Sequence, residues 1–296
     1  MSMRLRVKDL AGTAVAFLPP RGDWREGAVH SVYHHTVNIR LENGTLISLI
    51  SRRAPLHPFA IRLDEDEMER LQGIREGGAC RATQAEIRLD GQNGPVVLSW
   101  GREQLKNLSA DRLRGAAPTA AILEILNRKA EENAGKSALG FIADPTLNSP
   151  LLPWRDRIYR LIAAALRAES KEAVWVGKQL VGLGWGLTPT CDDFMAGMLA
   201  AFWFNRDYPI RKLAELGECL AVCGETQTTA VSAQFLKWAA KGYFSQGILE
   251  LLECLRGEDE LCLCAKLQQL LSMGHSSGCD TLMGIVCGMR YGGTWI

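Results

Sequence analysis

The spacing of apolar residues along the chain changes its period near residue 105. Before this point, apolar and polar residues alternate over short stretches, which is typical of β-strands with one buried face. The predicted strands are 28–33, 37–41, 45–50, 85–89 and 96–100. Turn-forming residues at 42–44 and 90–94 predict two hairpins. A short helix is predicted over 64–74, where acidic residues come first and an arginine follows.

After the change, apolar residues recur at the spacing of an α-helix. The predicted helices are 120–134, 155–168, 171–181, 192–204, 210–223, 228–241, 248–255, 259–271 and 279–289. Strands followed by helices predict an α+β fold. We therefore expect an N-terminal antiparallel β-barrel or sandwich over residues 1–105, a helix and linker over 106–153, and a mostly α-helical domain over 154–296.

One short pattern occurs twice in the predicted helical domain. Glycine, cysteine, aspartate and methionine hold the same places in Gly186–Met195 and in Gly274–Met283. Each copy runs from a turn rich in glycine and hydroxyl residues into an apolar run, as a loop that enters a helix does. A helix entrance offers unpaired backbone N–H groups and the positive end of a dipole. Two such entrances predict a site for a small anion.

Helix capping explains part of this pattern, because Thr190 with Asp193 and Ser277 with Asp280 have the spacing of a capping box. It does not explain the excess of glycines and further polar groups. We therefore predict that some of these residues bind the anion, and that Asp192, Asp193 and His275 are the candidate catalytic residues. The predicted anion-binding residues are Gly184, Gly186, Thr188, Thr190, Thr228, Thr229, Ser276, Ser277, Gly278 and Asp280.

Small residues also recur inside the two helices that follow the repeated pattern. Gly197 and Ala201 lie one turn apart in the first helix, and Gly284 and Gly288 lie one turn apart in the second. Glycine within a helix costs about 1 kcal/mol relative to alanine, so close contact between helices is the simplest reason for it. We expect the two helices to pack side by side, with both N-termini at one cleft.

Composition narrows the class of protein. A net charge of +1 argues against broad binding to nucleic acid or to a membrane surface. No apolar run reaches the length of roughly 18–20 residues that spans a bilayer, so we expect a cytoplasmic protein. The nine cysteines include no C-x-x-C pair and are interpreted as buried thiols. We predict no metal site from cysteine or histidine, although Asp192 or Asp193 is compatible with holding Mg²⁺.

The segment Gly182-x-Gly184-x-Gly186-Leu187-Thr188-Pro189-Thr190-x-Asp192-Asp193 resembles the signature of a bacterial family whose best-known members are AllH proteins. Two later segments, 228–244 and 274–282, are also similar to that family. Trp185 is a departure, because the family usually has proline at this place.

The resemblance implies a subunit of an oxamate carbamoyltransferase that acts with two other proteins in the degradation of allantoin, within purine catabolism. That activity cleaves oxalurate with phosphate to give oxamate and carbamoyl phosphate, all of them small anions. Two alternatives stay open from the residues alone: a Mg²⁺-dependent phosphotransferase and a non-catalytic assembly subunit. We expect no nucleic-acid or membrane partner, and a homo-oligomer is compatible with the sequence.

Overall fold

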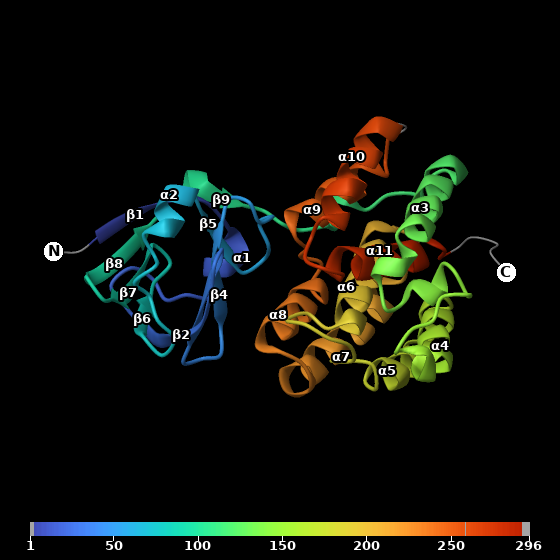
Figure 1. Cartoon of the computed structure of the whole chain (residues 1–296), viewed down its shortest axis with the longest axis horizontal. Helices are drawn as coiled ribbons and strands as arrows, with labels where there is room; N and C mark the ends of the chain where they lie inside the picture. The colour runs from blue at the N-terminus through green and yellow to red at the C-terminus, as the bar shows by residue number, and fades with distance from the viewer. Residues whose placement is uncertain (1–2, 258, 292–296) are drawn as a thin grey trace. The chain divides into compact units, whose positions relative to one another are not determined.

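The computed structural model describes residues 3–257 and 259–291, which form two compact units, 1–108 and 109–296 (Figure 1). The first unit is a β-barrel. Its strands are β1 (Met3–Ala11), β2 (Arg25–Tyr33), β3 (Thr36–Leu41), β4 (Leu46–Ser51), β5 (Ala60–Leu63), β6 (Ala79–Ala82), β7 (Glu86–Gly91), β8 (Gly94–Ser99) and β9 (Leu105–Lys106), with short helices α1 (Gly12–Val15) and α2 (Glu65–Glu69).

The sheet follows the order β5-β4-β3-β2-β6-β7-β8-β1 and closes because β1 also pairs with β5. The short strand β9 adds to β1. Side chains alternate between the core and the outer face, as β1 illustrates: Leu5 and Val7 are buried in the core, whereas Arg4 and Arg6 are exposed. The predicted α+β class with an N-terminal barrel is confirmed.

The barrel is mixed, which corrects the expectation of a purely antiparallel sheet. Strand β1 runs parallel to β8, and β4 runs parallel to β5. Parallel neighbours cannot be joined by a tight hairpin turn. Residues 52–59 accordingly form a longer connection between β4 and β5.

The second unit is helical and agrees with the predicted helices to within a few residues at most ends. Its helices are α3 (Ala120–Glu132), α4 (Arg155–Leu166), α5 (Ser170–Gly177), α6 (Thr190–Phe204), α7 (Ile210–Gln227), α8 (Ala230–Ala239), α9 (Gln246–Cys254), α10 (Glu260–Leu271) and α11 (Ser277–Met289). The segment predicted as a linker contains short 3-10 turns, including 134–136 and 140–142, and belongs to this unit.

Helices α6 and α11 form the centre of the helical unit, and most of their residues are buried. A Cβ atom on Gly284 would lie 1.9 Å from the carbonyl oxygen of Phe194, and one on Gly197 would lie 2.1 Å from that of Thr281. Each glycine therefore lets the backbone of the partner helix approach directly. The predicted side-by-side packing of these two helices is confirmed.

Cysteines are distributed largely as the sequence predicts. Cys80, Cys191, Cys279 and Cys287 are buried thiols, and Cys219, Cys223 and Cys264 are partly exposed. The exception is a disulfide that joins Cys254 at the end of α9 to Cys262 in α10. Within residues 3–257 and 259–291, no helix combines the length and the apolarity needed to cross a membrane.

Candidate functional site

The loop before α6 is shaped by three glycines in backbone conformations that other residues rarely adopt. Gly182, Gly184 and Gly186 have φ angles of 77°, 124° and 92°. Space is also restricted, because a Cβ on Gly182 would lie 2.0 Å from the carbonyl oxygen of Gln227. A Cβ on Gly184 would lie 2.5 Å from the backbone nitrogen of Thr190. The loop therefore lies tightly against the start of α6 and the end of α7.

Asp192 is an internal anchor for this loop. Its side chain is 2% exposed. Oδ1 accepts a hydrogen bond of 2.7 Å from the backbone N–H of Gly182, and Oδ2 accepts bonds of 2.5 Å from Thr228 and 2.7 Å from Ser232. Three donors thus connect the glycine loop, α6 and the start of α8 through one carboxylate. The Asp192 carboxylate therefore holds these segments of the protein together.

Asp193 lies in a different cluster, and this cluster joins the two copies of the repeated pattern. The Thr188 hydroxyl is 2.9 Å from Asp193 Oδ2 and 2.9 Å from the Ser277 hydroxyl. Thr188 and Asp193 belong to the first copy, whereas Ser277 begins α11 in the second. All three side chains are partly exposed. We call Thr188, Asp193 and Ser277 the entrance cluster, because it lies where α6 and α11 both begin.

Asp280 forms the buried end of the same region and is fully enclosed. Ser137, from the 3-10 segment after α3, donates a hydrogen bond of 2.5 Å to Asp280 Oδ1. The other oxygen, Oδ2, has no hydrogen-bond partner among the described residues. An unsatisfied buried carboxylate oxygen is costly when charged and favours the protonated acid.

Several amides at the two helix entrances are already used within the protein. The N–H of Cys191 donates to Leu183 O at 3.0 Å, and the N–H of Asp193 donates to Pro189 O at 3.1 Å. In the second copy, the N–H of Gly278 donates to Met273 O at 3.1 Å. These three amides are therefore occupied and do not contribute to the predicted backbone cradle. Anion binding at these entrances stays a prediction.

The remaining predicted residues are spread around this centre. Thr229 caps α8 by accepting from the N–H of Ser232 at 3.1 Å, and its hydroxyl donates to Leu187 O. Thr190 is buried at the start of α6, and Ser276 precedes α11 and is partly exposed. His275 is exposed on the turn before α11, away from any hydrogen bond within the described part of the chain.

Burial raises the pKa values of the three carboxyl groups. The pKa of Asp193 rises to about 8, chiefly because of burial, although the hydroxyls of Ser277 and Thr188 oppose the rise. The pKa of Asp280 rises to about 6 for the same reason, and the hydroxyls of Ser137, Ser276 and Thr190 oppose the rise. Burial also raises the pKa of Asp192, against the donors Gly182, Thr228 and Ser232. The raised pKa favours the protonated form of Asp193 near neutral pH.

These pKa values predict how stability depends on pH. A carboxyl group whose pKa is raised on folding binds its proton more tightly in the folded state, so its contribution is complete below its unfolded pKa and is lost as pH rises. Between about pH 4 and about pH 8, we expect the free energy of unfolding to fall more steeply in the parent protein than in Asp193→Asn. Urea unfolding at several pH values would measure this, and equal slopes would contradict it.

Comparison with known families gives two matches along the chain. Residues 180–289 match the family described as oxamate carbamoyltransferase subunit AllH, and residues 9–103 match the AllH family N-terminal domain. The chain belongs to the AllH family. No solved structure matches the chain. The AllH match contains the glycine loop, the entrance cluster and Asp280. The N-terminal match lies in the barrel unit.

The contacts of Asp192 and Asp280 include two hydroxyl residues that are not among the predicted site residues. Ser137 contacts Asp280 but lies outside both matched ranges. Ser232 contacts Asp192 and is buried on the first turn of α8. Ser232 follows Thr228 by four residues in the sequence. This spacing places the two residues on the same face of a helix, and it could have indicated that they act together. For Ser137 there was no local signal, because it reaches the site only through the packing of its segment against α11.

The two adjacent aspartates do not form a shared pair of metal ligands. The carboxylate of Asp192 receives three hydrogen bonds and faces Thr228 and Ser232, whereas Asp193 faces Thr188. Mg²⁺ requires oxygen ligands that converge on one point. Within the described ranges, no group of three or more histidine, cysteine, aspartate or glutamate side chains is placed to hold a metal ion.

Proposed function

We propose that this subunit binds the small anionic substrate of an oxamate carbamoyltransferase at the entrance cluster, with Asp193 as its proton donor. The observation that carries the proposal is the direct contact between Thr188 and Ser277, which joins the two repeated motifs beside a protonated carboxyl group. Hydroxyls and a neutral acid are hydrogen-bond donors that do not repel an anion. The family assignment supplies the reaction class.

The chemistry of carbamoyl transfer suits such a donor. In the proposed reaction, a phosphate oxygen attacks the carbamoyl carbon of oxalurate, and the bond from that carbon to the oxamate nitrogen breaks. That nitrogen needs a proton to leave as the amide of oxamate. Protonated Asp193 supplies it, and the hydrogen phosphate returns a proton to Asp193 as carbamoyl phosphate forms. Thr188 and Ser277 orient the acid and contact the substrate oxygens.

Asp192 has a positioning role in this proposal. It holds Gly182 of the loop and Thr228 of the next helix entrance at hydrogen-bond distance. These contacts keep the loop, and therefore Thr188, in place beside Asp193. Asp280 lies beneath the cluster and adds negative potential when ionised, which helps to keep the pKa of Asp193 high.

Partner subunits are proposed to cover the glycine loop. Trp185 and Leu187 alternate with its glycines and are 59% and 45% exposed. Large apolar side chains exposed next to a polar cluster are typical of contact surfaces. A partner seated on this loop would exclude water from the entrance cluster and strengthen its hydrogen bonds. The alternative, a purely structural subunit, predicts the same contact without any binding of substrate.

Calorimetry on the purified chain tests the site. Phosphate, carbamoyl phosphate, oxamate and oxalurate are titrated separately into the parent protein and into Thr188→Val. We expect saturable binding of at least one anion in the parent and a loss of about tenfold in affinity when the bridging hydroxyl is removed.

Thr226→Val is the matched control, because the Thr226 hydroxyl near the end of α7 donates only to Cys223 O, away from the entrance cluster. Its affinity should equal that of the parent. If the isolated chain binds none of the anions, the titration is repeated with the partner subunits present. Unchanged affinity in Thr188→Val under both conditions would contradict the proposal.

A further inference from the structure

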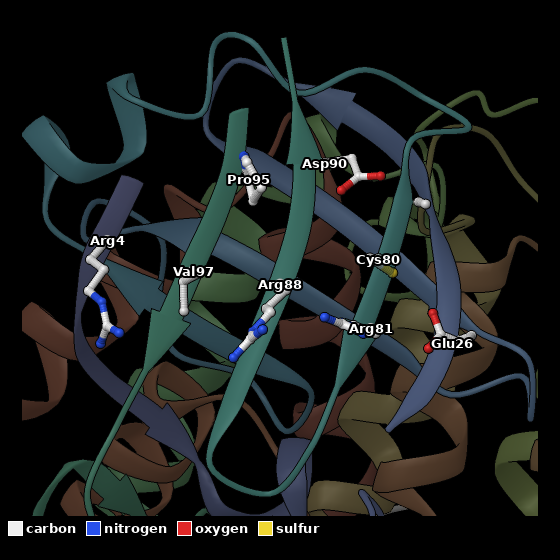
Figure 2. A pocket seen from close by; sticks show the side chains of 9 residues that line it. Arg4, Glu26, Cys80, Arg81, Arg88, Asp90, Pro95 and Val97 are labelled. Carbon is white, nitrogen blue, oxygen red and sulfur yellow. The ribbon is translucent and has the colours of Figure 1, made fainter. Parts of the chain in front are cut away.

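A row of arginines crosses the outer face of the barrel. Strand pairing places Arg4 of β1 opposite Val97 of β8, Val97 opposite Arg88 of β7, and Arg88 opposite Arg81 of β6. Glu26 of β2 continues the row opposite Arg81. The row spans five neighbouring strands, and Figure 2 shows its side chains. The row follows from register alone, since residues opposite one another on adjacent strands point to the same face.

This arrangement is unfavourable without a further partner. Like charges directly opposite one another destabilise a sheet, and Arg81 and Arg88 are such a pair. Both guanidinium groups lie over the ring of Trp24, at 4.6 and 4.7 Å from its centre. The indole thus holds the two groups close together in defined positions. A stacked guanidinium keeps its N–H edge free for an anion.

The charges around this row are only partly neutralised. Arg88 is paired with Glu86 at 2.7 Å. Among the residues that the structure describes, Arg4, Arg81, Glu26 and Asp90 have no ion pair and no side-chain hydrogen bond. Two cations and two carboxylates therefore face the same region without pairing with each other. Burial, and to a smaller extent Glu26 and Asp90, raise the pKa of the nearby Cys80 thiol to about 11.

A cavity of about 400 Å³ lies between these charges. Val97 and Pro95 give its lining an apolar part, and Val97 is only 6% exposed although it is on the outer face. In Figure 2 the guanidinium groups of Arg4 and Arg88 lie toward one side and the carboxylates of Glu26 and Asp90 toward the other. The volume is within the usual range for small-molecule sites, roughly 300–1,000 Å³.

We propose that this cavity binds a free α-amino acid as a zwitterion. The carboxylate of the ligand pairs with Arg4 and with the Arg88 N–H groups that Glu86 does not occupy, and its ammonium group faces Asp90 and Glu26. Charge complementarity selects this class, because the lining presents both signs of charge: among the described residues Arg4, Arg81, Glu26 and Asp90 are unpaired, and Arg88 is bound to Glu86 through one edge only. A long polyanion such as nucleic acid would meet the two carboxylates and be repelled. The site lies wholly within the barrel unit and is separate from the entrance cluster.

The test uses the full chain and the standard L-amino acids, each presented singly and followed by saturation-transfer NMR, with calorimetry for those that bind. Acetate and ethylamine serve as the two halves of the ligand. We expect at least one amino acid to bind and both halves to bind much more weakly. Arg4→Gln should weaken the binding by about tenfold.

Arg6→Gln is the matched control, because Arg6 lies on the same strand and face but pairs with Glu67 and does not line the cavity. Its affinity should equal that of the parent. Absence of binding by every amino acid would overturn the proposal. Binding of acetate as tightly as of the amino acids would also overturn it, in favour of a simple anion site. Equal loss in Arg4→Gln and Arg6→Gln would show non-specific attraction instead.

Discussion

Gly284→Ala is expected to lower the free energy of unfolding by about 3 kcal/mol or more. The added methyl group would lie 1.9 Å from the carbonyl oxygen of Phe194 and 2.8 Å from the backbone nitrogen of Met198. Both obstacles are backbone atoms of α6, so no rotamer change can relieve the overlap. The two helices would have to separate along the seam that forms the centre of the helical unit. Urea unfolding followed by circular dichroism measures the loss.

Gly247→Ala is the control for this prediction. Gly247 is also buried in a helix, near the start of α9, but an added Cβ there would meet only Met273 Sδ at 3.9 Å. Alanine has a better helix propensity than glycine, so this variant should be neutral or more stable by up to about 1 kcal/mol. Similar unfolding curves for the two variants would show that the α6–α11 contact is looser than described.

Asp193→Asn is expected to lower the carbamoyltransferase rate of the reconstituted enzyme by about 10²–10⁴-fold, the usual contribution of a general acid. Because the raised pKa favours the protonated form of Asp193 near neutral pH, asparagine resembles it in shape and charge. It still accepts from Thr188 but has no acidic proton to transfer. The fold and the assembly with partner subunits should therefore survive. Initial rates, unfolding curves and size-exclusion chromatography separate these effects.

We expect Asp192→Asn, at the adjacent position, to lower the stability of the protein and not the activity of its folded form. Three donors converge on the Asp192 carboxylate, and an amide would turn its own N–H₂ group toward at least one of them. We expect a loss of stability of about 1–3 kcal/mol, with activity falling as the folded population falls. If Asp193→Asn instead destabilised the protein and kept its specific activity, Asp193 would have a structural role and the proposed proton transfer would be wrong.

The spacing of apolar residues predicted most of the helices and strands, because the buried side of each element sets that spacing locally. Helices α3 to α11 each carry an apolar pattern that is visible within a single stretch of sequence. The glycines of α6 and α11 likewise predicted that the two helices touch, since a glycine in a helix is costly without a close neighbour. The alternation of Leu5 and Val7 with Arg4 and Arg6 was equally regular, and it could have identified β1 in advance.

Other features depend on contacts between distant segments and leave little local trace. The parallel pairs β1–β8 and β4–β5 are set by closure of the barrel, which no single strand encodes. Asp192 and Asp193 look equivalent in sequence, but the direction in which each side chain leaves α6 gives one a buried anchor and the other the entrance cluster. The row from Arg4 to Glu26 emerges only from register across five strands.

The position of β1 in the barrel also constrains how the chain folds during synthesis. This strand is made first, yet its neighbours β5 and β8 end at residues 63 and 99. One edge of β1 can therefore pair only after residue 63 has been made, and the other only after residue 99. Contacts between residues so far apart in sequence slow folding, because the entropy of closing the long loop is lost before the contact forms. The barrel therefore closes late in folding, once β8 is available to pair with β1.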